Sequence, residues 1–143
     1  MKTVILILII VQILTGSVMF MILAGSESTS QPVLAAATVA HVIDGDTIVL
    51  TTGERVRLIG VDAPEIGTCG ADEAAAFVRD RVLNRTVWLS SSGADLDRFG
   101  RLRRYVWIQY PTDAQDEAQI QAKQLNALLL SHGYAQLMVV RHD

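Results

Sequence analysis

The first part of the folded region has polar and apolar residues alternating with a period of two, which is typical of β-strands. Two runs rich in β-branched residues, Thr38–Ile43 and Thr47–Leu50, flank Asp44-Gly45, a dipeptide typical of tight hairpins. A third run, Arg55–Val61, alternates arginines with aliphatic residues. Pro64 cannot donate to a strand ladder, so the third strand must end before it. The pattern predicts three consecutive strands.

The next part changes to a helical period. Asp72–Leu83 has apolar residues on one face, and Val87–Leu89 and Leu102–Tyr110 read as a fourth and a fifth strand joined by a turn at Asp95–Gly100. A last helical stretch follows Pro111. The expected core residues of the two helices are Ala74, Phe77, Val78, Val82, Ile120, Leu125, Leu128 and Leu129.

Gly133 is a good C-terminal cap for the last helix, and Tyr134–Val140 is expected to be extended. Three strands, a helix, two strands and a helix within about 100 residues fit a mainly β, α+β domain. The architecture predicted from this order is a small Greek-key barrel with two to three helices packed on it.

The residues ahead of this domain are apolar from Val4 to Ala24, apart from Gln12 and residues 15–17. At about 1.5 Å per residue this segment could cross a hydrocarbon layer of about 30 Å. Its length favours an uncleaved membrane anchor over residues 1–24. The alternative is a cleaved signal peptide, with Ala35-Ala36-Ala37 as the small-residue cleavage site.

Residues 25–37 are small and polar and include a proline, so they are expected to form a flexible linker before the domain at 38–143. Lys2 precedes the apolar run, and no comparable basic cluster follows it. The positive-inside tendency therefore predicts that the domain is exported, either anchored outside the cytoplasm or secreted.

The formal net charge of the chain is −3, so any affinity for a polyanion must come from local arginines. Nine of the ten arginines lie between Arg55 and Arg104. Acidic residues in the same interval leave open an ordinary salt-bridged surface. The single cysteine, Cys69, excludes an intramolecular disulfide.

Three acidic residues stand where strands begin or end. Asp46 opens a strand, where aspartate is disfavoured, Asp62 closes the next one, and Glu65 follows Asp62 by three residues. Carboxylates are the ligands that calcium prefers, and a glutamate beside a metal can hold or deprotonate a water. The ordinary alternatives are a hairpin turn at the motif that contains Asp46, a capping or turn role for Asp62, and a solvated loop position for Glu65.

Arg57 and Arg101 come from different strands, and each lies close in sequence to one acidic motif. Arg57 precedes Asp62 and Glu65, and Arg101 follows Asp97. Hydrolysis of a phosphodiester builds negative charge on the equatorial oxygens of phosphorus, and the planar guanidinium group matches those oxygens bidentately. Surface salt bridges are the alternative for each arginine alone. Together with the carboxylates, they indicate an apparatus for attacking a phosphodiester.

Three motifs, Asp44-Gly45-Asp46-Thr47, Arg57 through Glu65, and Asp97-Arg98-Phe99-Gly100-Arg101, resemble the thermonuclease (staphylococcal nuclease-like, micrococcal nuclease) family in residue type, order and spacing. The likeness extends from about Thr38 to about Val140. It implies a five-stranded OB-fold barrel and a monomeric, calcium-dependent endonuclease that acts on DNA and RNA with little sequence preference and leaves 3′-phosphates.

The same resemblance implies roles for individual residues. Calcium would be held by the side chains of Asp46 and Asp62 and by the backbone carbonyl of Ala63. Glu65 would act as general base, and Arg57 and Arg101 would stabilise the transition state. The substrate-side loop would contribute Arg98 and Phe99.

Two other classes of function stay open at this point. One is a catalytically inactive OB-fold module, tethered to the membrane through residues 4–24, that binds nucleic acid or a protein. The other is an exported structural or interaction domain that binds no nucleic acid, which the acidic net charge mildly favours.

Overall fold

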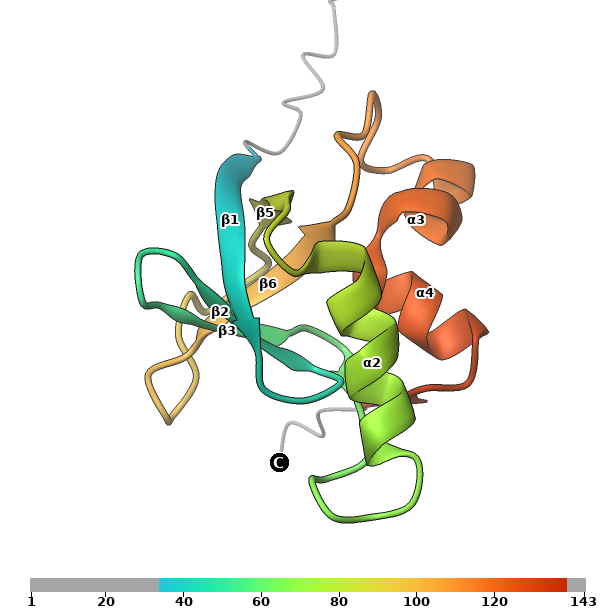
Figure 1. Ribbon diagram of the computed structural model, residues 1–143. Coiled ribbons are helices and arrows are strands. Elements are labelled where there is room, and N and C mark those ends of the chain that lie inside the picture. The colour runs from blue at the N-terminus through green and yellow to red at the C-terminus, as the bar shows by residue number, and fades with distance from the viewer. Residues whose placement is uncertain (1–33, 139–143) are drawn as a thin grey trace, which may run out of the picture. The chain divides into compact units, whose positions relative to one another are not determined.

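Five strands close into a barrel in the computed structural model, which describes residues 34–138 (Figure 1). Their order around the barrel is β1-β2-β3-β6-β5, and all neighbours are antiparallel except β3 and β6, which are parallel. The predicted five-stranded barrel of the OB-fold type is confirmed. The strands are β1 (Ala35–Val42), β2 (Thr47–Leu50), β3 (Arg55–Leu58), β5 (Thr86–Ser90) and β6 (Leu102–Trp107).

Three helices lie on one side of the barrel, and the β2–β3 turn and the long β5–β6 loop project from the other side (Figure 1). The helices are α2 (Ala71–Val82), α3 (Glu117–Lys123) and α4 (Leu125–Ser131). Apolar residues from the strands, α2 and α4 form one buried cluster, which burial of apolar surface stabilises. It includes Val39, Ile48, Val56, Leu58, Phe77, Val78, Val82, Val87, Val106, Leu125 and Leu129.

Strand β1 begins at Ala35, three residues before the predicted start of the domain. Ala35 pairs with Leu89, and the next two alanines pair with Trp88 and Val87. Three consecutive alanines have low strand propensity, so only this tertiary pairing makes them part of the sheet. The expected linker at 25–37 therefore ends before Ala35, and the rest of it lies outside the described residues apart from Leu34.

The predicted strand Arg55–Val61 is two strands, because the chain turns at Gly60. Gly60 has a φ of 75°, a left-handed conformation that glycine adopts without steric cost. After the turn, β4 (Val61–Asp62) leaves the barrel and pairs with β7 (Gln136–Leu137). Asp62, which follows this turn, is held in place by the small second sheet that β4 and β7 form.

The last helical stretch is two short helices rather than one. Gln124 separates α3 from α4 with an extended backbone (φ −92°, ψ 119°), because it bridges to Trp107 of β6 while Lys123 accepts a hydrogen bond from Ile108 N. Ile120, expected in the core, is only half-buried. Strand β6 ends at Trp107, three residues earlier than predicted.

Helix α4 ends at Ser131, and Gly133 caps it, as predicted, in a Schellman motif. Gly133 has a φ of 74°, its N–H donates to Leu130 O, and the N–H of Tyr134 donates to Leu129 O. This reversal returns the chain towards β4, where Gln136 pairs with Asp62. The predicted extended tail is thus strand β7 over residues 136–137.

Within residues 34–138 there is no helix that combines the length and the apolar character needed to cross a membrane. The expected anchor or signal peptide, residues 1–24, lies outside the described residues.

Candidate active site

Asp46 is a buried carboxylate at the start of β2, and only 7% of the residue is exposed. Its backbone N–H donates to Asp44 Oδ1 (3.0 Å), which folds the preceding turn. Its own oxygens accept hydrogen bonds from Thr47 Oγ1 (3.0 Å) and from the backbone N–H of Ala63 (2.9 Å). Asp46 therefore fastens the β1–β2 turn to the segment after β4.

Gly45 is required here by close packing rather than by a left-handed backbone. A Cβ added at this position would lie 2.6 Å from Ala63 Cβ and 2.8 Å from Ala74 Cβ, closer than real side chains approach. The turn thus rests directly on the segment after β4 and on α2. The turn lies at Asp44-Gly45, as the sequence predicted. Glycine is required there because it has no side chain, and not because of its backbone freedom.

Arg57 links the two predicted metal-binding carboxylates. Its Nη2 lies 3.0 Å from Asp46 Oδ2 and 3.3 Å from Asp62 Oδ1. Its Nη1 donates to the backbone oxygens of Val61 (2.7 Å) and Leu58 (3.1 Å). The guanidinium group therefore both neutralises the carboxylates and fixes the turn between β3 and β4.

Burial raises the pKa of the Asp46 carboxyl above its usual value, and the nearby Asp44 carboxylate adds to this effect. The hydrogen bond from Ala63 N and the positive charge of Arg57 favour the ionised form but do not cancel the effect of burial. An ionised Asp46 at this position is thus an electrostatically costly group that a cation stabilises.

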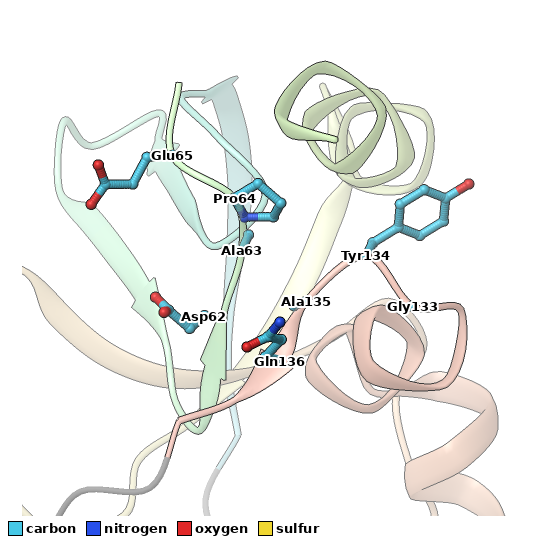
Figure 2. A pocket seen from close by; sticks show the side chains of 8 residues that line it. All are labelled: Asp62, Ala63, Pro64, Glu65, Gly133, Tyr134, Ala135 and Gln136. Carbon is cyan, nitrogen blue, oxygen red and sulfur yellow. The ribbon is translucent and has the colours of Figure 1, made fainter. Parts of the chain in front are cut away.

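Asp62, Ala63 and Glu65 line one cleft of about 370 Å³, together with Pro64 and residues 133–136. Figure 2 shows the carboxylates of Asp62 and Glu65 on the same side of this segment, with the Tyr134 ring on the opposite side. Asp62 and Glu65 are exposed, whereas Ala63 is buried. The cleft brings two acidic side chains of the motif to one solvent-accessible face.

The two aspartates supply carboxylate oxygens of the kind that calcium prefers. The carboxylates of Asp46 and Asp62 both contact Arg57 Nη2, so they lie close together on either side of this nitrogen. Within residues 34–138, no three His, Cys, Asp or Glu side chains form a metal-binding group. The backbone N–H of Ala63 binds Asp46 and Ala63 directly follows Asp62, so this residue lies beside both carboxylates.

Arg101 is presented by a loop folded around Asp97. Asp97 Oδ1 accepts from the backbone N–H groups of Phe99 and Arg101, both at 2.9 Å, and Oδ2 pairs with Arg101 Nε at 2.7 Å. Partial burial acts to raise the pKa of Asp97, but these hydrogen bonds and the charge of Arg101 outweigh it, so the pKa is lowered. The pair uses Nε, and the two Nη groups have no hydrogen-bond partner in the described part of the chain.

Phe99, at the tip of the same loop, is 67% exposed. The guanidinium carbons of Arg98 and Arg101 lie 4.7 and 5.3 Å from the centre of its ring. All three residues line a second, larger cleft of about 780 Å³ together with Arg57. The structure therefore brings the two predicted catalytic arginines and both predicted substrate-contacting residues to one cleft.

Asn126, a residue that sequence reasoning missed, holds this arrangement together from the helical side. It is 3% exposed; its Oδ1 accepts from Val106 N (3.0 Å), and its Nδ2 donates to Ile59 O (2.8 Å). It therefore joins α4 to β6 and to the turn that positions Arg57. The available signal was an asparagine inside the otherwise apolar run Leu125–Leu130.

The model of a known family, described as staphylococcal nuclease homologue, matches residues 55–143. A thermonuclease of Staphylococcus hyicus is 32% identical over 115 residues, which are 72% of this chain and 68% of the relative. A thermonuclease of Staphylococcus intermedius is 38% identical over 79 residues (49% of this chain, 47% of the relative). A micrococcal nuclease of Shigella flexneri is 33% identical over 102 residues (68% of this chain, 55% of the relative).

The matched region spans about two thirds of the length of the first relative and about half of the length of the other two. The family match contains Arg57, Asp62, Glu65 and Arg101, and the barrel of the structure is the one expected for it. The chain belongs to the staphylococcal nuclease, or thermonuclease, family.

Proposed function

We propose that this chain is an exported, calcium-dependent endonuclease that hydrolyses the phosphodiester bonds of DNA and RNA with little sequence preference and leaves 3′-phosphates. Membership of a nuclease family supports the general class of activity. The observation that carries the proposal is the position of Arg57. Its guanidinium group contacts two carboxylates and also lines the cleft that contains Arg101.

Asp46, Asp62 and the Ala63 carbonyl would hold the calcium ion. When bound, the ion would offset the charge of the substrate phosphate and make phosphorus more electrophilic. Calcium suits this set because it accepts irregular oxygen coordination completed by water and substrate, whereas magnesium requires a tighter octahedron.

Glu65 is the group that takes the proton of the attacking water or orients that water. Its carboxylate is exposed on the same side as that of Asp62, so a water molecule can reach both. The bond from the water oxygen to phosphorus forms as the bond from phosphorus to O5′ breaks. The 5′ oxygen receives a proton and leaves as a hydroxyl, and the phosphate stays on the 3′ side.

Arg57 and Arg101 bind the equatorial oxygens of phosphorus as their negative charge grows. The two arginines reach the cleft from different elements, β3 and the loop before β6, so they can approach the phosphate from two directions. Guanidinium groups held by carboxylates keep a fixed orientation, which reduces the reorganisation needed in the transition state.

Cleavage of DNA and RNA by the full chain, kept in a mild detergent because of its apolar N-terminus, tests the proposal. We expect cutting with calcium and little with magnesium or a chelator. Glu65→Gln should lower the rate by about 10²–10⁴-fold, whereas Glu73→Gln, an exposed glutamate on α2, should leave it unchanged. Product ends should resist extension by a polymerase until a phosphatase removes the 3′-phosphate.

A folded chain that cuts neither DNA nor RNA in calcium would overturn the enzymatic proposal. Salt-sensitive binding without cutting would then identify the alternative, an inactive nucleic-acid-binding module. Absence of such binding would identify a protein-interaction domain.

A further inference from the structure

Three arginines of β3, β6 and the loop before β6 have their charge offset by a neighbouring carboxylate. Arg57 pairs with Asp46 and Asp62, Arg101 pairs with Asp97, and Arg104 pairs with Asp95 at 2.7 Å. Arg98 and Arg103 line the larger cleft without an ion-pair partner among residues 34–138; Arg98 lies in the loop beside Phe99, whereas Arg103 is in β6 and is partly exposed. Its positive charge is therefore added to the cleft without compensation, in a chain whose net charge is −3.

Arg103 is placed beside Arg57 by the parallel pairing of β6 with β3. The two residues are partners in register, and both line the larger cleft. Registered residues of neighbouring strands point to the same face of a sheet, and the strand axes are about 4.8 Å apart. Arg104, the next residue, points to the other face, where it reaches Asp95. The cleft thus has a guanidinium group directly next to the proposed catalytic one.

We propose that Arg103 binds a phosphate of the substrate adjacent to the scissile one, and that it contributes to affinity for the nucleic-acid strand rather than to the chemical step. This inference rests on the proposed nuclease function. A strand that enters the cleft with one phosphate at Arg57 and Arg101 has its next phosphate one nucleotide away, and Arg103, registered with Arg57, supplies there a charge that no ion pair offsets. Every nucleotide has that phosphate, so the contact is independent of base sequence.

Equilibrium binding of full-length chain to single-stranded oligonucleotides in a chelator separates binding from cleavage. Arg103→Ala is compared with the wild type and with Arg79→Ala, an exposed arginine on α2 that removes the same charge away from the cleft. One lost phosphate contact should weaken binding about fivefold at 0.1 M salt and lower the slope of log K against log salt by about 0.7. Arg103→Lys should restore most of the affinity, and Arg79→Ala should change neither quantity.

Turnover in calcium gives the second readout. We expect Arg103→Ala to raise KM about fivefold, in line with the loss of binding, while kcat stays within about twofold of the wild type. Oligothymidylate and guanine-containing oligonucleotides should be affected equally.

Unchanged affinity and salt slope in Arg103→Ala would overturn this inference and leave the nuclease function intact. A loss confined to guanine-containing strands would also overturn it, because it would mean that Arg103 reads a base edge. A fall in kcat at constant KM would assign Arg103 to the transition state instead. If the wild type neither binds nor cuts, the proposed function fails together with this inference.

Discussion

Arg57 and Asp46 form an ion pair of 3.0 Å in which both side chains are largely buried, with exposed fractions of 12% and 9%. The same arginine also reaches the exposed carboxylate of Asp62 and two backbone oxygens. One side chain therefore has a structural role and a proposed catalytic role. Substitutions at the surrounding positions separate the two.

Arg57→Ala should destabilise the chain in the absence of calcium. Removing one partner of a buried ion pair leaves an uncompensated charge, which costs about 3–5 kcal/mol. We expect a loss of about 3 kcal/mol in the free energy of unfolding, measured by urea denaturation in a chelator, and partial recovery in calcium. Arg101→Ala, whose ion pair is more exposed, should lose less stability but as much activity. Equal stability losses in the two variants would contradict the structural role of Arg57.

Asp62→Asn should abolish the metal response with little effect on folding. The Asp62 side chain is 64% exposed, and such an ion pair contributes about 0–1 kcal/mol. We expect calcium affinity, measured by titration calorimetry, to fall at least tenfold, a loss seen even for groups one step removed from a metal. Asp72→Asn, an exposed aspartate on α2, is the matched control. Unchanged calcium affinity in Asp62→Asn would remove this residue from the proposed ligand set.

Gly45→Ala should distort the site through packing. The added Cβ would meet the side chains of Ala63 and Ala74, and overpacking of this kind costs about 1–3 kcal/mol. Because Ala63 follows Asp62 and binds Asp46, calcium affinity should fall as well. Gly45→Ala combined with Ala63→Gly removes the shorter of the two clashes and should recover part of the lost stability. Strict additivity of the two substitutions would contradict direct packing.

Asp97 should stabilise the fold above acidic pH and lose this effect in acid. Its pKa is lowered in the folded chain, so folding favours the ionised form, and the stabilisation is present above the unfolded pKa of about 3.8 and lost as pH falls through the folded pKa. Asp97→Asn should cost about 1–2 kcal/mol at pH 7, because it removes the charge-assisted bond to Arg101. Denaturation curves between pH 7 and pH 3 should show this difference shrinking below pH 4. A difference that does not change with pH would show that the Asp97 charge does not contribute.

Asn126→Ala should destabilise the barrel strongly, because the side chain binds two backbone groups of other elements. It would leave the buried N–H of Val106 and the partly buried carbonyl of Ile59 without their partner, at about 1–3 kcal/mol for a fully buried group. We expect a total loss of about 2–4 kcal/mol in urea denaturation. The ionised side chain introduced by Asn126→Asp keeps the acceptor and loses the donor, whereas its protonated form has one O–H donor as well. A loss at low pH that is smaller than that of the alanine variant would support the assignment of the two bonds.

The strands and α2 could be predicted because each has a regular pattern and a local boundary signal. Thr47–Leu50 is bounded by an Asp-Gly turn on one side and a Gly-Glu turn on the other, and both of its ends were predicted correctly. The boundaries that failed depend on distant residues. Ala35 is in a strand because Leu89 is next to it, and α3 ends because Gln124 bridges to Trp107. No local sequence pattern indicates such long-range pairings.

The candidate site shows the same division. Residue type, spacing and the family resemblance together selected Asp46, Asp62 and Arg57, which the structure brings together around one guanidinium group. Asn126 was not selected, because its role exists only once α4 lies against β6. Arg103 was not selected either, since its significance comes from parallel pairing with Arg57, 46 positions earlier in the chain.

The parallel pairing of β3 with β6 also controls when the chain becomes able to act. Before these strands meet, Arg57 and Arg101 belong to separate segments, and no phosphate can contact both. For a chain with the proposed activity, the unfolded form is therefore harmless to nucleic acid, and the capacity to cut arises together with closure of the barrel.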